Sequence, residues 1–127
     1  MEFPNDKFKP RKDNYSRARG GPTKFLYVSC SSCHEPAMIY QKDGPGTLRR
    51  YYSDRIVWPP KLVQEQSKVT AETVKQAGSL ACSTADCDNV FAHPMVYEPE
   101  NRPAYRAIAG SVHVDKNAAQ AQNRQNN

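Results

Sequence analysis

The four cysteines of this chain fall into two close pairs that lie far apart in the sequence. Cys30 and Cys33 are separated by two residues, and Cys82 and Cys87 by four. A tetrahedral zinc site takes four ligands, with sulfur atoms at about 2.3 Å, and two tight turns can each supply two of them. The spacing therefore predicts that all four cysteines bind one Zn²⁺ and that two distant parts of the chain meet there.

Paired cysteines also form disulfide bonds, which stabilise many small secreted proteins. A secretory signal contains about 7 to 15 consecutive apolar residues, and no such stretch precedes Phe25. The sequence also has no run that approaches the ~18 apolar residues of a membrane span. We therefore expect a cytoplasmic protein with reduced thiols and no membrane partner.

The run Cys30-Ser-Ser-Cys33-His34 also matches the attachment motif of a c-type haem, with Met95 as a candidate sixth ligand. In that chemistry both thiols bond to the haem and the histidine binds its iron. Haem attachment takes place in compartments that require export, and it leaves the second cysteine pair without a role. A haem protein is therefore the less favoured alternative to a zinc site.

The net charge of +5 is concentrated near the N-terminus. Residues 1–24 carry seven basic and three acidic side chains, whereas nine basic and nine acidic side chains cancel in residues 25–114. Few apolar residues accompany the basic ones, so we expect residues 1–23 to form a flexible basic arm. Residues 115–127, rich in Asn, Gln and Ala, are predicted to be a disordered polar tail. The domain itself then spans residues 24–114.

The residues after each cysteine pair predict a β-hairpin. Pro36–Tyr40 and Leu48–Tyr51 flank a glycine-rich turn at residues 43–46, and Pro94–Tyr97 and Arg102–Tyr105 flank a second turn. A domain of this size is too small for a large core, so a metal ion is its expected cross-link. The predicted fold class is a small, mostly-β zinc ribbon made of two cysteine knuckles, each followed by a hairpin, with disordered termini.

One further strand, one strand extension and one insertion complete the expected domain. A strand at residues 24–29 leads into the first cysteine pair, and Val112 and Val114 are expected to extend the strand that begins near Tyr105. Forty-eight residues separate the two cysteine pairs, whereas compact sites with two knuckles have ~15 to 20. Residues 57–79 are therefore predicted to be a loop insertion, with one or two helical turns that end at Gly78, because their apolar residues are too sparse for a continuous helical stripe.

Two runs of sequence resemble a known group of proteins. YQKDGPGTLRRYYSDRI, after the first cysteine pair, and PMVYEPENRPAYRAIAGSV, after the second, are similar to segments of small, uncharacterised microbial zinc-ribbon proteins. The resemblance covers roughly residues 25–114, and the second pair here is spaced by four residues where two is usual in the group. It implies a zinc-ribbon fold and no particular activity.

Basic and aromatic residues gather after the first predicted turn. This cluster comprises Lys42, Arg49, Arg50, Tyr51, Tyr52 and Arg55. Basic side chains neutralise phosphates, and exposed aromatic rings stack on unpaired bases. In the alternative, structural interpretation, the tyrosines fill a small core and Arg55 pairs with Asp54 or Glu98. The candidate nucleic-acid-binding residues of the arm and the cluster are Lys7, Lys9, Arg11, Lys12, Arg17, Arg19, Lys42, Arg49 and Arg50.

The sequence offers little for catalysis. A zinc ion with four cysteine ligands has no open position for water, and no glycine-rich phosphate loop or HExxH helix is present. None of the three histidines is predicted to be a ligand, although His34 or His93 could replace a cysteine. We therefore expect no enzyme but an accessory factor that binds nucleic acid, with RNA or a ribonucleoprotein favoured over DNA. The alternative is a module that binds a larger protein assembly, and the oligomeric state is left open.

Overall fold

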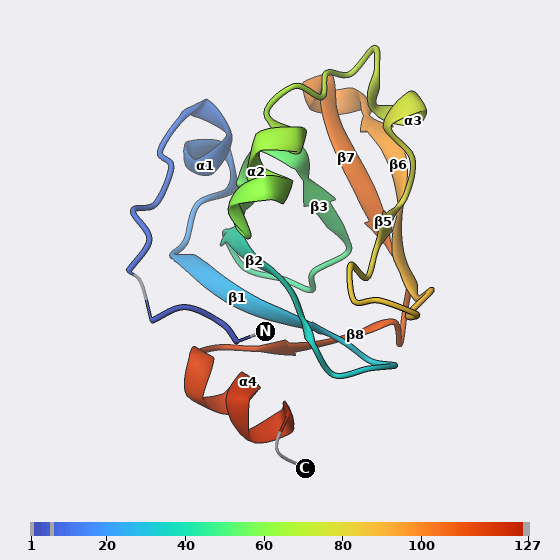
Figure 1. The fold of residues 1–127 in the computed structure, drawn as a ribbon. Coiled ribbons are helices and arrows are strands. Elements are labelled where there is room, and N and C mark those ends of the chain that lie inside the picture. Colours follow the sequence, from blue (N-terminus) through green and yellow to red (C-terminus); the bar gives the residue numbers. More distant parts are fainter. Residues whose placement is uncertain (1, 6, 126–127) are drawn as a thin grey trace.

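The computed structural model describes residues 2–5 and 7–125, and the side chains up to residue 123. Within these residues the chain forms two four-stranded antiparallel sheets, so the prediction of a small, mostly-β protein is confirmed (Figure 1). Sheet A has the strand order β4 (Ile56–Trp58), β2 (Pro36–Asp43), β1 (Thr23–Cys30), β8 (Val112–Asp115). Sheet B has the order β3 (Arg50–Tyr52), β7 (Arg102–Ala107), β6 (Val90–Tyr97), β5 (Leu80–Ala81).

Short helices connect or cover the sheets. In the described part of the chain they are α1 (Asn14–Arg19), α2 (Pro60–Gln66), α3 (Val74–Ala77) and α4 (Ala118–Gln125), with 3₁₀ turns η1 (Ser53–Arg55) and η2 (Glu98–Glu100). Helices α2 and α3 lie in the predicted insertion, and Gly78, with a φ of 83°, ends α3 as expected. Helix α2 begins at Pro60, because the fixed φ of proline suits a first helical turn.

The two sheets pack around a shared core. Strand alternation sends Val28 and Met38 of sheet A to the inner face, where they belong to one apolar cluster with Phe91 and Tyr105 of sheet B. The neighbour of Met38 in sequence, Ile39, points to the opposite face and belongs to a second apolar cluster. Strand β2 is therefore covered on both sides, which explains the unbroken apolar run in its first five residues, Pro36–Tyr40.

The glycine-rich turn does not close a hairpin, so this prediction is wrong. Strand β2 pairs with β1 and β4, whereas β3 pairs with β7, and the turn carries the chain from sheet A to sheet B. A Cβ on Gly44 would lie 2.8 Å from the carbonyl oxygen of Gly20, at the end of α1. This close approach and a φ of +78° both require glycine there. Turn chemistry specifies a chain reversal but not which sheet the next strand joins.

The second predicted hairpin is confirmed, since β6 and β7 pair in register up to Tyr97 and Arg102. The strand predicted at residues 24–29 is confirmed as β1. Val112 and Val114, however, do not extend β7. They form β8, which pairs with β1 in sheet A, because the chain turns at Gly110, where φ is +79°, and leaves sheet B.

The N-terminal arm is docked on the outer face of sheet A, so the prediction of a disordered N-terminus is wrong for the described residues. Phe3 is 7 % exposed, and its ring centroid lies 5.2 Å from that of Tyr27 and 5.6 Å from that of Trp58. The ring of Phe8 lies 5.9 Å from that of Phe25. Two phenylalanines are a weak apolar pattern, yet they anchor the arm because the sheet presents an aromatic face to them.

The C-terminal segment covers the same face. Asn117 Oδ1 accepts a hydrogen bond of 2.9 Å from the Gln120 amide at the start of α4, and Ala121 is buried in one cluster with Phe3 and Ile39. The helix and the N-terminal segment lie beside the β1 and β8 side of sheet A (Figure 1). The predicted disorder is therefore wrong for residues 115–125, because small alanines let the helix approach the sheet closely. Residues 1, 6, 126 and 127 of the predicted disordered ends lie outside the described residues.

Candidate functional site

Each cysteine pair lies at the tip of a β-hairpin. The first pair connects β1 to β2, and the second connects β5 to β6. The Cys30 amide donates to the Glu35 carbonyl at 2.9 Å, and the Cys82 amide donates to the Asn89 carbonyl at 2.8 Å. In both tips, the backbone amide of the first cysteine donates a hydrogen bond to the carbonyl of the residue two positions after the second cysteine. The two turns are closed in the same way despite their different lengths.

The four cysteine sulfurs converge on one point. The Sγ atoms of Cys30 and Cys87 lie 3.7 Å apart, those of Cys33 and Cys82 lie 3.5 Å apart, and all four lie within 4.8 Å of one another. A tetrahedron with metal–sulfur bonds of about 2.3 Å has edges of about 3.8 Å. The cysteines are free thiols, so donor chemistry and spacing both fit a metal site with four cysteine ligands.

Hydrogen bonds fix the buried sulfur of Cys30. It accepts from Asn89 Nδ2 at 3.2 Å and from the Ser32 amide at 3.4 Å. Asn89 Nδ2 also donates to the Ser111 carbonyl at 2.8 Å, and the Ser31 amide donates to the same carbonyl at 3.1 Å. These bonds tie both hairpin tips to the turn before β8. Sequence reasoning missed Asn89 and Ser111, because a polar residue near a knuckle carries no signal of its own.

These contacts separate the pKa values of the thiols. Burial raises the pKa of Cys30, but hydrogen bonds from two backbone amides and from Asn89 lower it to about 6. A hydrogen bond from the backbone amide of Asn89 lowers the pKa of Cys87, while burial and the neighbouring sulfurs raise it to about 12. Burial also raises the pKa of Cys82. Thiols this close cannot all ionise without a cation, so binding of a metal would release protons from the site.

The histidines supply no ligand atom to the cluster found among the described residues, which consists of the four cysteines. His34 and His113 stack beside the first tip, with ring centroids 5.8 Å apart and planes at 5°. Strand β8 brings them together, because it pairs His113 with Ser29. His93 instead shares a hydrogen bond of 2.9 Å with Ser79 through Nδ1.

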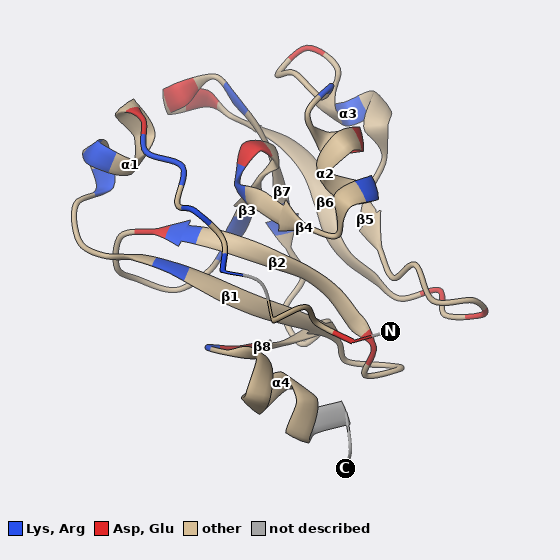
Figure 2. Ribbon diagram, turned by 60° about the vertical axis from the view of Figure 1, so that its left-hand side comes forward, with Lys and Arg blue, Asp and Glu red and all other residues tan. Residues whose placement is uncertain are grey.

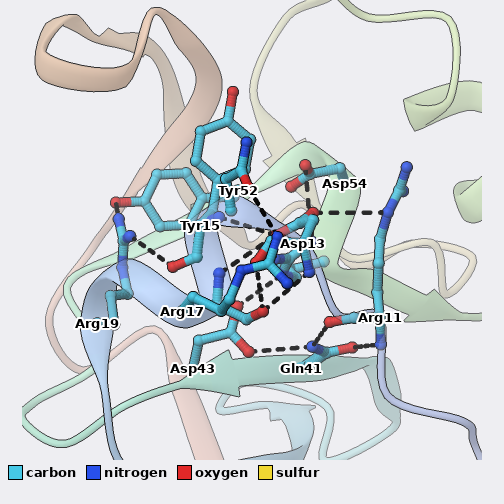
Figure 3. Close-up of polar contacts among 12 residues, drawn as sticks. Arg11, Asp13, Tyr15, Arg17, Arg19, Gln41, Asp43, Tyr52 and Asp54 are labelled. Carbon is cyan, nitrogen blue, oxygen red and sulfur yellow. Dashed lines mark hydrogen bonds and ion pairs between the residues drawn. The ribbon is translucent and has the colours of Figure 1, made fainter.

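The basic arm is held by its main chain. Gln41 Oε1 accepts from the Arg11 amide, and Gln41 Nε2 donates to the Arg11 carbonyl, both at 2.8 Å (Figure 3). Asp13 Oδ1 accepts from the amides of Tyr15 and Ser16 and so caps α1. The predicted phosphate contacts of the arm whose side chains are exposed are Lys7, Lys9, Arg11, Lys12 and Arg17.

Buried ion pairs tie the arm to the sheets. Arg55 is 1 % exposed, and its guanidinium lies 2.6 Å from Asp13, 2.7 Å from Asp43 and 3.7 Å from Asp54. The expected pairing of Arg55 with Asp54 is confirmed, but the two nearer partners come from distant segments. The hydrogen bond from Arg55 lowers the pKa of Asp13 to about 2. We call the whole set the arm network; it comprises Arg19, Arg55, Arg102, Asp13, Asp43, Asp54 and Glu100.

The other two arginines of the arm network are also engaged. Arg102 lies between the rings of Tyr15 and Tyr52, 3.9 and 3.8 Å from their centroids, and donates to Asp54 at 2.7 Å. Arg19 makes two hydrogen bonds of 2.8 Å to Glu100. Arg19, a predicted phosphate contact, is therefore already paired within the protein.

The tyrosines of the predicted cluster are internal. Tyr51 is 1 % exposed and belongs to the shared core, and Tyr52 is 7 % exposed beneath Arg102. The structural interpretation of these two residues is confirmed, because alternation places them on opposite sides of β3 and both sides are covered.

The remaining predicted phosphate contacts lie near the turn between β2 and β3. Lys42 Nζ donates to the Gly44 carbonyl at 2.7 Å, Arg49 is exposed, and the Arg50 guanidinium lies 4.4 Å from the centroid of the Tyr97 ring. In Figure 2 the basic positions of α1 and of the paired ends of β1 and β2 lie on one side of the molecule. The hairpin tip between β5 and β6, which carries acidic residues, lies on the opposite side (Figure 2).

Comparisons with protein-family models, with curated proteins and with solved structures find no match to this chain. The resemblance to zinc-ribbon proteins therefore has the cysteine cluster as its support. Among the described helices, none is long and apolar enough to cross a membrane.

Proposed function

We propose that the four cysteines bind one Zn²⁺, which cross-links the two hairpin tips as in a zinc ribbon. The convergence of the four sulfurs carries this proposal, because soft thiolates in tetrahedral arrangement are the ligands of structural zinc. A c-type haem would bond to Cys30 and Cys33 alone, and it would leave two equally close sulfurs without a function.

Zinc at this site would serve the fold and not a reaction. A catalytic zinc keeps one coordination position for water or substrate, and four sulfurs occupy every position of a tetrahedral ion. The protein would then act as a binding module and not as an enzyme.

We infer that the partner is a nucleic acid, with RNA or a ribonucleoprotein favoured over DNA. The net charge of +5 supports this inference, as does the exposure of five basic side chains on the docked arm. Four thiolates and one Zn²⁺ carry a charge of −2, and Asp86 and Asp88 lie in the same hairpin tip. The exposed cations of the arm and this acidic tip lie on opposite sides of the molecule (Figure 2), and the arm would attract and orient a polyanion.

Two measurements on the full-length protein test this proposal. The first is metal content, where we expect one zinc per chain; a covalently attached haem would overturn the zinc assignment. The second is the affinity for a fluorescent RNA strand at 50 and 200 mM salt. If the protein contacts about three phosphates of a single strand, each contributing about 0.7 to the slope of log K against log salt, binding should be about 20-fold weaker at the higher salt. If neither RNA nor DNA binds, the nucleic-acid assignment fails and a module that binds a protein assembly becomes the better explanation.

A further inference from the structure

Two surface hollows adjoin at the start of β3. One, of about 420 Å³, lies beside the turn between β2 and β3. The other, of about 390 Å³, lies beside the end of β7 and includes Met95 of β6. Both are lined by Leu48, Arg49 and Arg50, so the two hollows are neighbours that share one wall. We call the two together the arginine groove. Arg19, Arg55 and Asp43 of the arm network also line the first hollow. The basic residues of the groove outside that network are Lys42 in the first hollow, Arg106 in the second, and the shared Arg49 and Arg50.

Two arginines of this groove face each other. In the register of sheet B, Arg50 lies directly opposite Arg106. Like charges in directly opposed positions destabilise a sheet. Ion pairs within the described residues engage the three arginines of the arm network, but none engages Arg49, Arg50 or Arg106. An anion in the groove would relieve a repulsion that the fold itself leaves unbalanced.

The same pattern occurs at the other end of the groove. Lys42 on β2 lies directly opposite Lys24 on β1. Burial and the charge of Lys24 lower the pKa of Lys42. Two pairs of opposed cations therefore flank the turn between β2 and β3. A chain of phosphates could contact both.

The groove presents its cations on fixed main chain. The Arg49 carbonyl accepts a hydrogen bond of 3.0 Å from the Ala107 amide, so the pairing of β3 with β7 continues through Arg49. Arg50 is held over the Tyr97 ring. Cations on rigid strands lose less conformational entropy on binding than cations on a loose segment.

We propose that the arginine groove binds the phosphate backbone of a nucleic-acid strand, with Arg49, Arg50 and Arg106 as the phosphate contacts. This inference rests on the proposed function and places its interface on sheet B instead of on the arm alone. The rings of Tyr51 and Tyr52 are buried, and Arg50 covers the ring of Tyr97, so these tyrosines offer no open face for base stacking. Binding in the groove is therefore independent of base sequence.

The test compares two double variants of the full-length, zinc-loaded protein. Arg49→Gln with Arg106→Gln removes two exposed charges from the groove, and Lys61→Gln with Lys75→Gln removes two exposed charges from α2 and α3. Affinity for a labelled single strand of mixed-sequence RNA is measured over a range of salt. The groove variant should bind about 10- to 60-fold more weakly at 50 mM salt, and its slope of log K against log salt should fall by about 1.4, because each contact contributes about 0.7. The helix variant should bind within about twofold of the intact chain.

Additional variants and RNA strands distinguish the possible outcomes. Arg49→Lys with Arg106→Lys should keep most of the affinity, because the positive charges remain, and unchanged zinc content will show that each variant is folded. Strands of only adenine or only uracil should bind within about threefold of each other, and a strong preference for one base would overturn phosphate-only contact.

Equal weakening in both Gln variants would show an effect of net charge and overturn the groove. If the groove variant binds as well as the intact chain, the groove is overturned while the proposed function stands. If the intact chain binds no nucleic acid, both are overturned.

Discussion

The two ends of this molecule are held together by different chemistry. At the metal end, two hairpin tips meet through four sulfurs within 4.8 Å, which repel one another as thiolates unless a cation lies between them. At the arm end, three arginines meet four carboxylates, and each charge has an opposite partner within 4 Å. The proposed zinc site would therefore need an ion from outside the chain, whereas the charges of the arm end are paired within it.

This difference predicts separate sensitivities. Chelators and thiol reagents should act on the metal end, whereas acid and charge substitutions should act on the arm end. The two ends share strand β2, which follows Cys33 and ends at Asp43. Because β2 joins them, the two ends are separable only if a substitution at one end leaves the other intact.

The largest effect is expected from Cys82→Ser. Loss of one of four sulfurs should abolish stoichiometric zinc binding and lower the free energy of unfolding by roughly 5 kcal/mol or more, because metal binding and folding are coupled at structural zinc sites. Metal content and chemical denaturation measure both effects. The control is Ser83→Ala, at the exposed neighbouring position. A Cys82→Ser variant with full zinc content and normal stability would contradict the account.

Asp43→Ala should have the next largest effect. It leaves Arg55, which is 1 % exposed, without the carboxylate 2.7 Å from its Nε. Leaving a buried charge uncompensated costs about 3–5 kcal/mol, and we expect about 3 kcal/mol here because Asp13 and Asp54 still lie within 4 Å of Arg55. Glu65→Ala, at an exposed position of α2, should cost little. Zinc content should stay at one per chain in both variants, and loss of zinc from Asp43→Ala would show that the two ends are not separable.

Phe3→Ala tests how firmly the arm is docked. A buried Phe→Ala change costs about 3–5 kcal/mol in a core, and we expect about 2–3 kcal/mol here because the arm can undock without unfolding the sheets. The emission of Trp58, the single tryptophan, should also change, since the two ring centroids are 5.6 Å apart. Lys9→Ala, at an exposed position of the same arm, serves as control. If Phe3→Ala and Lys9→Ala behave alike, the arm is not anchored by its aromatic contacts.

The smallest effect concerns pH. Because the pKa of Asp13 lies at about 2 in the folded protein, against an ordinary value of 3.8, its ion pair contributes stability above pH 3.8 that is lost as the pH falls towards 2. Asp13 is partly exposed, so the contribution should be about 1 kcal/mol or less. Asn caps a helix as well as Asp does, so Asp13→Asn removes only the charge. The stability difference between the intact chain and this variant should shrink on acidification from pH 5 to pH 3. A difference that does not change with pH would assign the effect to something other than this carboxylate.

The parts of the structure that could be predicted are those with local causes. The spacing of the cysteines predicts their meeting, since a short turn must direct two sulfurs to one point. The hairpin of β6 and β7 was predicted from its turn, and its last pair, Tyr97 with Arg102, closes around Asn101, whose φ is +48°.

The parts that could not be predicted depend on long-range partners. Arg55 and Asp13 are separated by 42 positions in the chain, and no sequence pattern links them. Phe3 anchors the N-terminal arm only because Tyr27 and Trp58 lie on the outer face of sheet A. The valines of β8 suit either sheet, so the sequence predicts a continuation of β7, and only the packed fold decides between the two sheets.

The most direct test of the account is a count of zinc and of reactive thiols in the full-length protein, before and after chelation. Zinc that joins the two hairpin tips predicts one zinc per chain and four thiols that are protected from a thiol reagent until the chelator removes the metal. A folded protein that contains no metal, with its thiols freely reactive or joined in two disulfides, would contradict the central claim.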